Sequence, residues 1–170
     1  NSFIGDNNLT SNSWGIYLNQ SYNNTLTTNN LTSNTYGLEL VTSENNNIFN
    51  NAFSNTNNAL DDGSVNEWNS SFTETVSIIG GTFSGGNFWS DYEGKDLGGG
   101  TYPYNETGDG VGDTDIPYAT GITGGDYLPL TNDDGSLDDC VEISEDYILS
   151  QDLTCSGDDG ITIAADDLTL

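Results

Sequence analysis

The first 64 residues repeat one pattern three times, and this repeat constrains the fold more than any other feature of the chain. The first copy covers residues 1–22, the second residues 23–44, and a degraded third copy residues 45–64. Self-similarity at a period of about 22 residues is typical of a solenoid, in which successive turns of the chain stack on one another.

Apolar and polar residues alternate over short runs within each copy, which is the period of a half-buried strand and not of a helix. Asn, Ser, Thr and Gly separate these runs, and such residues favour tight corners. Two sets of apolar residues fall at equivalent positions: Ile4, Leu26 and Ile48, and Leu9, Leu31 and Phe53. The sequence therefore predicts an all-β fold, a right-handed parallel β-helix with about 22 residues per coil. A disordered Asn/Ser/Thr-rich tract is the alternative, but such tracts do not keep Leu and Ile in phase.

The asparagines of the repeat are also in phase. Asn7, Asn29 and Asn51 align, as do Asn12, Asn34 and, after a one-residue deletion, Asn55. Stacked amides bond one another along the axis of cross-β assemblies. We therefore expect asparagine ladders at the corners of the coils.

The charge of the chain excludes several partners. It carries 27 acidic residues, one basic residue (Lys95) and no His, for a net charge of −26. Nucleic acid and anionic membranes require a cationic surface, so we expect neither as a partner. A field of this strength repels itself unless cations screen or bind it, although a solvated acidic surface accounts for much of the charge. No run of apolar residues is long enough to be inserted in a membrane.

Cysteines and glycosylation motifs favour an extracellular location. Cys140 and Cys155 can form one disulfide, with a pair of reduced thiols as the alternative. Asn8 and Asn30 lie at equivalent, outward-facing positions and are the preferred acceptors of N-linked glycans. The sequons begin at Asn8, Asn19, Asn23, Asn30, Asn69 and Asn105.

The composition changes after residue 64. A strand is expected over residues 73–79, and residues 87–130 are rich in aromatic residues, glycine and acids. We interpret residues 65–132 as a loop-rich element that closes the solenoid, because uncovered strand edges invite uncontrolled pairing. The aromatic side chains could stack on sugars, but in loops they more often bury a small core.

Five motifs after the repeat carry a resemblance to a known family. They are Asn66-Glu-Trp68, Gly86-Asn-Phe-Trp-Ser-Asp-Tyr92, Asp109-Gly-Val-Gly-Asp-Thr114, Pro117-Tyr118 and Asp126-Tyr-Leu-Pro-Leu130. With the repeat, they resemble the NosD-like/CASH group of parallel β-helix proteins, common on archaeal cell surfaces, over residues 1–132. The resemblance implies the fold and a surface-associated life, but the family hosts several functions.

The resemblance also implies a cation site. The family's acidic loop alternates oxygen ligands with glycines around Ca²⁺. Here the matching positions are Asn105, Thr107, Asp109 and Asp113, with Asp91, Asp96, Asp115 and Asp126 as substitutes for missing carboxylates. Calcium is therefore the expected ion, with Asp91, Asp96, Asp109, Asp113 and Asp115 as its ligands, against the alternative of a plain glycine turn with solvated acids. Copper, which the family name suggests, is disfavoured because the chain lacks His and Met.

The C-terminal part begins a new pattern. Residues 133–139 form a polar linker, and residues 140–170 alternate in strand fashion like the opening coils of a further β-helix. The chain thus starts and stops inside a β-helix. If the last coils of one copy receive the first coils of the next, the contact generates an open filament. The alternative is that these residues are part of a larger surface protein.

The predicted function is structural: a cell-surface protein that forms a head-to-tail homopolymer through its β-helix edges and carries N-linked glycans. A carbohydrate-binding or adhesin module is the alternative. We expect no enzymatic activity, because a lyase would need cationic groups to neutralise its anionic substrate and three coils offer a short groove for a hydrolase.

Overall fold

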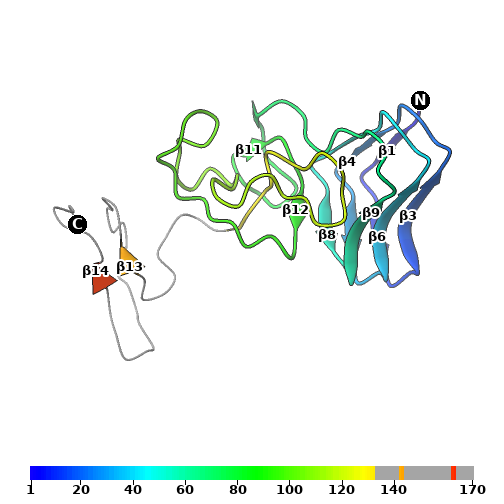
Figure 1. Ribbon diagram of the computed structural model, residues 1–170, viewed down its shortest axis with the longest axis horizontal. Helices are drawn as coiled ribbons and strands as arrows, with labels where there is room; N and C mark the ends of the chain where they lie inside the picture. The colour runs from blue at the N-terminus through cyan, green and yellow to red at the C-terminus, as the bar shows by residue number, and fades with distance from the viewer. Residues whose placement is uncertain (133–141, 144–161, 164–170) are drawn as a thin grey trace. The chain divides into compact units, whose positions relative to one another are not determined.

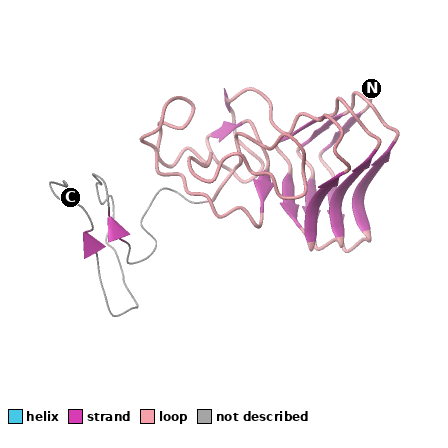
Figure 2. Ribbon diagram, in the orientation of Figure 1, coloured by secondary structure: helices cyan, strands magenta, loops and turns pink. Residues whose placement is uncertain are grey.

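The computed structural model describes residues 1–132, 142–143 and 162–163, and its described part consists of strands and loops without helices (Figure 2). Contacts divide the chain into two units, residues 1–134 and 135–170. The predicted linker 133–139, the two cysteines and most of 140–170 lie outside the described residues.

Three parallel sheets build the N-terminal unit. The first contains β1 (Phe3–Gly5), β4 (Thr25–Thr27) and β7 (Asn47–Phe49). The second contains β2 (Asn8–Thr10), β5 (Asn30–Thr32), β8 (Ala52–Ser54) and β12 (Phe88–Trp89). The third contains β3 (Trp14–Asn19), β6 (Tyr36–Val41) and β9 (Asn57–Asp61), which lie side by side in Figure 1.

Each coil contributes one strand to each sheet, so the fold is a parallel β-helix, and the all-β prediction is confirmed. Ile4 is the register partner of Leu26, and Leu26 is the partner of Ile48, a step of 22 residues at each coil. Leu9, Leu31 and Phe53 form the equivalent row in the second sheet. Because strand side chains alternate between the two faces, these rows point inward and form the core.

The corners recur with the same period. Residues with positive φ occupy matched places in successive coils: Asp6, Thr28 and Asn50; Ser11 and Ser33; Gln20 and Thr42; Asn23 and Asn45. Asn and Asp tolerate this left-handed conformation, whereas the β-branched Thr28 and Thr42 adopt it against their preference. Stacking of the coils on both sides holds them there.

Aromatic rings close the core at its C-terminal end. Trp89 stacks on Phe53 with ring centroids 4.6 Å apart, and Tyr118 stacks on Trp89 at 4.3 Å. Trp89 and Trp68 are almost fully buried. This column covers the apolar end of the last coil with the Trp89 ring from β12 and the Tyr118 ring from a loop.

Coil stacking continues beyond residue 64. Glu67 pairs in parallel with Asn47, and β12 pairs with β8, so residues 65–68 and 86–90 extend the stack. The intervening residues form a short antiparallel hairpin of β10 (Thr73–Glu74) and β11 (Phe83–Ser84). The strand expected over 73–79 ends at Glu74, because a turn closed by the Gly80 N–H to Ser77 O bond follows it.

The second unit contributes one described element pair. β13 (Glu142–Ile143) and β14 (Thr162–Ile163) pair in parallel, with Glu142 opposite Thr162. This is the arrangement expected for consecutive coils of a solenoid.

Candidate functional site

The first coil forms one edge of all three sheets, since β1, β2 and β3 each end their sheet's strand order. The Asn30 N–H donates to Asn7 O at 2.8 Å, and the Ser11 N–H donates to Thr32 O at 3.4 Å. Backbone groups of alternate residues in a parallel strand point to opposite sides. Asn8 and Thr10 therefore direct their backbone N–H and C=O groups away from the second coil.

Amide ladders give this edge a direction. Asn29 donates its backbone N–H and its Nδ2 to Asn51 Oδ1, at 3.0 and 2.9 Å, and Asn7 donates the same pair to Asn29. Asn12, Asn34 and Asn55 repeat the pattern, so both predicted ladders are confirmed. The bonds between successive asparagines all run toward the C-terminal coils, whereas Nδ2 of Asn29 and of Asn34 also donates back to the first coil, to Ile4 O and Leu9 O, both at 2.8 Å. At the first coil, the Oδ1 atoms of Asn7 and Asn12 receive no hydrogen bond from the described residues.

Exposed aromatic side chains cluster on the first coil. Phe3 is 67% exposed, and Trp14 and Tyr17 are each about half exposed. Trp14 stacks on Tyr36 with ring centroids 6.3 Å apart, and its indole N–H donates to Glu39. The equivalent region of the second coil is covered, and its Leu26 and Leu31 are buried. The first coil thus presents both unpaired backbone groups and apolar surface.

The opposite end of the stack is covered. The Asp61 N–H donates to Gly121 O at 2.9 Å. Asp126 is fully buried and accepts the Asn87 N–H at 2.7 Å. Residues 117–128 supply these contacts, together with the Tyr118 ring that ends the aromatic column. The two ends of the β-helix therefore differ in their exposed backbone.

Three of the five predicted calcium ligands lie close together in the acidic loop. Asp96 is buried and accepts the Gly108 and Gly110 N–H groups at 2.8 and 2.7 Å. Asp109 accepts the Val111 N–H at 2.8 Å, and Asp113 accepts the Gly98 N–H. Burial, with a smaller contribution from the charges of Asp109 and Asp113, raises the pKa of Asp96 to about 6. Burial likewise raises the pKa of Asp109 and that of Asp113.

The other two predicted ligands lie elsewhere. Asp91 accepts hydrogen bonds from Asn58 Nδ2 at 2.6 Å and from the Tyr118 hydroxyl at 3.0 Å. Asp115 is exposed and lines the same shallow hollow as Asp91, of about 360 Å³. Asp126, a proposed substitute, is the buried terminus of an amide ladder.

The five acids thus separate into two groups. Within residues 1–132 and the two short C-terminal strands, no set of three or more His, Cys, Asp or Glu side chains is arranged to hold a metal ion. The backbone N–H groups of the glycine-rich loop occupy carboxylate oxygens that calcium would need. Calcium binding stays a prediction.

The sequon asparagines are accessible, with one half-buried exception. Asn69 is half-buried, and the exposed set comprises Asn8, Asn19, Asn23, Asn30 and Asn105. Asn8 and Asn30 are register partners on the outer face, and Asn30 Nδ2 lies 3.5 Å from Asn8 Oδ1. Glycosylation at these positions stays a prediction, as does the disulfide, whose cysteines lie outside the described residues.

Comparison with known proteins identifies the family. The family model described as periplasmic copper-binding protein (NosD) matches residues 1–94, more than half of the chain. The chain belongs to the NosD family. No curated protein and no solved structure matches it. Among the described residues, no helix has the length and hydropathy needed to cross a membrane.

The copper of the family's description does not fit the side chains of this NosD member. Copper sites use imidazole, thiolate or thioether ligands. The chain has no His and no Met, and its two Cys are outside the described residues. The carboxylates and amides that remain are hard oxygen donors, which favour Ca²⁺ or Mg²⁺ over copper.

Sequence reasoning missed several residues that organise this NosD β-helix. A third ladder runs through Asn24, Asn46 and Asn66, and its bonds measure 2.8 and 3.0 Å between side chains. Asn87 extends the first ladder across an insertion, and Asp126 ends it. The alignment of Asn24 with Asn46 at a spacing of 22 was visible in the sequence. The spacing to Asn87 was not, because the hairpin interrupts the period.

Proposed function

We propose that this NosD-family chain is a structural protein of the cell exterior that associates head to tail, with the first coil receiving a coil of another copy. The position of the first coil carries the proposal, because β1, β2 and β3 are all edge strands on one side of the stack. Parallel strand addition there would pair the backbone groups of Asn8 and Thr10.

The ladders support a head-to-tail contact over a head-to-head one. Asn7 and Asn12 offer acceptor oxygens on the first coil, and every bond between successive ladder asparagines runs from the N-terminal to the C-terminal residue. An incoming coil with the same polarity would place its backbone N–H groups on these oxygens. A two-fold related coil would oppose acceptor to acceptor, which leaves buried oxygens unpaired.

The parallel β13–β14 pair indicates which segment of a second copy would bind the first coil. Its partners Glu142 and Thr162 are 20 residues apart, close to the coil length of the N-terminal stack. Residues 140–170 of a second copy are therefore the proposed occupant. A contact between different patches of identical chains propagates without closing, which yields a filament.

An extracellular location is part of this proposal. The family is described as periplasmic, and six sequons lie in the chain, five of them at exposed asparagines. The strong negative charge disfavours contact with nucleic acid and with anionic membranes. We assign the chain no catalytic activity.

One backbone N–H tests the proposal. Thr10→Pro removes a donor that faces away from the second coil, and edge strands accept proline at such positions. Thr10→Ala keeps the N–H and is the matched control, since both variants lose the sequon at Asn8. Electron microscopy and sedimentation of the 170-residue protein should show filaments for wild type and Thr10→Ala, and shorter or no filaments for Thr10→Pro.

Circular dichroism of Thr10→Pro is the control for its fold, and its spectrum should match that of Thr10→Ala. Monodisperse monomers of the wild-type protein at high concentration and in high salt would overturn the filament. Equal assembly of the proline variant would overturn the proposed edge.

A carbohydrate-binding role is the second candidate, and the aromatic cluster on the coils favours it. Trp14 and Tyr36 stack at an interplanar angle of 14°, with Tyr17 beside them at 5.9 Å from Trp14. Flat exposed rings beside the Glu39 carboxylate suit a sugar face and its hydroxyl groups. Quenching of Trp14 fluorescence by neutral oligosaccharides tests this role, and Trp14→Phe controls for the signal.

A further inference from the structure

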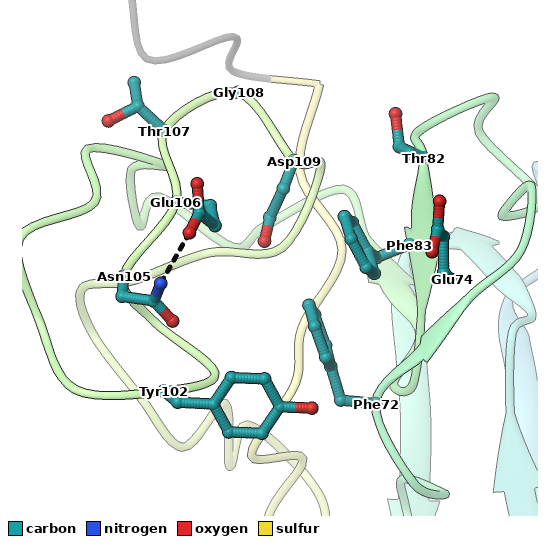
Figure 3. Close-up of a pocket in the computed structure, with 10 residues that line it drawn as sticks. All are labelled: Phe72, Glu74, Thr82, Phe83, Tyr102, Asn105, Glu106, Thr107, Gly108 and Asp109. Carbon is teal, nitrogen blue, oxygen red and sulfur yellow. Dashed lines mark hydrogen bonds between the residues drawn. The ribbon is translucent and has the colours of Figure 1, made fainter.

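A hollow of about 570 Å³ lies between the β10–β11 hairpin and the loop of residues 102–109 (Figure 3). The first-coil edge and the amide ladders contribute none of its lining side chains. It combines an aromatic wall with a rim of carboxylates, and its chemistry is independent of coil stacking.

Aromatic rings form the wall on the hairpin side. Phe72 and Phe83 stack with centroids 4.6 Å apart and planes 8° from parallel. Tyr102 meets the edge of Phe72 at 5.5 Å and is 73% exposed. Glu74 is the register partner of Phe83, so a carboxylate stands directly beside the rings.

Asp109 supplies the buried polar group. Its side chain is 6% exposed, and its Oδ1 accepts the Val111 N–H at 2.8 Å. Its Oδ2 is buried and has no hydrogen-bond partner among the described residues. Figure 3 shows its carboxylate directed from the loop toward the space in front of Phe83. A buried carboxylate oxygen without a donor is rare in folded proteins and indicates a missing partner.

The lining selects the chemistry of that partner. Glu74, Glu106 and Asp109 contribute three carboxylates, and no Lys or Arg lines the hollow. A cation is therefore favoured over a neutral molecule, and aromatic faces attract cations further. The Oδ2 atom needs an N–H or O–H donor, which a quaternary ammonium lacks. A metal ion is disfavoured because the described residues contain no set of three suitable ligands.

We propose that this hollow binds a primary alkylammonium ion, whose nitrogen donates to Asp109 Oδ2 while its carbon chain packs on Phe72, Phe83 and Tyr102. Free amines and lysine side chains share this chemistry. Both would be drawn to a chain whose net charge is −26.

The experiment titrates n-pentylammonium chloride into the 170-residue protein at constant ionic strength and follows the NMR spectrum. Saturable shifts at Phe72, Phe83 and Tyr102 are expected, with a Kd of about 1 mM for a ligand of this size. Nα-acetyl-lysine amide and 1,5-diaminopentane distinguish a lysine side chain from a free diamine by their relative affinities.

Asp109→Asn keeps the acceptor for Val111 and removes the charge, so binding should weaken about tenfold or more. Asp115→Asn makes the same charge change at an exposed site outside the hollow and should leave Kd within about twofold. Tyr102→Ala, on an exposed ring, should weaken binding about threefold, and it serves if Asp109→Asn fails to fold.

Unchanged affinity in the Asp109→Asn and Tyr102→Ala variants would overturn the proposal. Equal binding of 1-pentanol or of a neutral monosaccharide would also overturn the proposal, because the hollow would then select ligands by shape or by hydroxyl groups instead of by charge. Displacement of the ammonium by stoichiometric Ca²⁺ would assign Asp109 to a metal ion.

Discussion

Asn87 donates both its backbone N–H and its Nδ2 to one oxygen of Asp126, Oδ2, at 2.7 and 3.2 Å. Asn51 donates the same pair to Asn87 Oδ1, at 3.1 and 3.0 Å. Asp126 therefore occupies the place of the next asparagine and ends the ladder with an acceptor. A carboxylate suits this place because each asparagine of the ladder donates its backbone N–H and its Nδ2 to the next ladder oxygen, and Asp126 supplies the last of these oxygens.

The other ladders also reach a carboxylate. Asn58, which accepts the Asn55 N–H, donates to Asp91, and Asn66 Nδ2 lies 3.4 Å from Asp61 Oδ2. Three acids that look like surface charge in the sequence thus contact the C-terminal ends of the amide ladders.

Asp126→Asn should destabilise the fold by about 1–3 kcal/mol. The carboxylate accepts from Asn87 on one oxygen and from the Leu128 N–H on the other, at 3.0 Å. The side-chain amide of the Asp126→Asn variant would keep one acceptor oxygen, but its NH₂ group would face the N–H donor of Asn87 or of Leu128. Urea unfolding measures the change, with the exposed Asp115→Asn as control. Equal stability of the two variants would contradict the role of Asp126 as ladder terminus.

The stability of the protein should fall as the pH rises through about 6. Burial raises the pKa of Asp126 to about 6 from its ordinary value of 3.8. The folded state then binds this proton more tightly than the unfolded chain. The stabilisation from protonated Asp126 is therefore complete below pH 3.8 and is lost as the pH rises through the folded pKa. The loss amounts to up to about 3 kcal/mol. Urea unfolding between pH 4 and 8 checks it, and Asp126→Asn should make the profile shallower, with Asp96, whose pKa is also raised to about 6, supplying the remaining slope.

Asn29→Ala should lower the free energy of unfolding by about 2–4 kcal/mol. The fully buried Asn29 side chain accepts from Asn7 and donates to Asn51 Oδ1, Ile4 O and Thr27 O. Its neighbour Asn30 is exposed, and Asn30→Ala should change stability by no more than about 0.5 kcal/mol. Similar losses for both would mean that the ladder contributes little beyond ordinary surface bonding.

Assembly should increase with salt. Copies with a net charge of −26 repel one another, and the screening length shortens from about 30 Å at 0.01 M to about 3 Å at 1 M salt. Sedimentation velocity across this range should show growing particles while circular dichroism stays constant. Particles that dissolve as salt increases would indicate an electrostatic contact in place of strand addition.

Calcium, if bound by the acidic loop, should raise the Tm of chelator-treated protein by several degrees. Asp113→Asn should abolish this increase, whereas Asp6→Asn, an exposed acid on the first coil, should retain it. Differential scanning fluorimetry measures both, with NaCl of matched ionic strength as reference. Equal effects of NaCl and CaCl₂ would remove calcium from the loop.

The sequence by itself determined the β-helix, because every coil repeats the same local choice. Leu26 and Leu31 alternate with polar residues, and asparagines recur at a fixed spacing, so strand, corner and ladder follow from neighbours 22 residues apart. A pattern that repeats in one dimension can be recognised without knowledge of distant contacts.

The tertiary structure alone decided what the acids do. Asp96 caps a glycine loop, Asp126 ends a ladder, and Asp109 faces a hollow, although all three read as equivalent carboxylates in the chain. The roles of Asp96 and Asp126 depend on backbone donors that lie 12 to 39 residues away in the chain. No periodicity specifies these distances, since the loops after residue 68 pack by aromatic contacts and single hydrogen bonds that only the folded chain brings together.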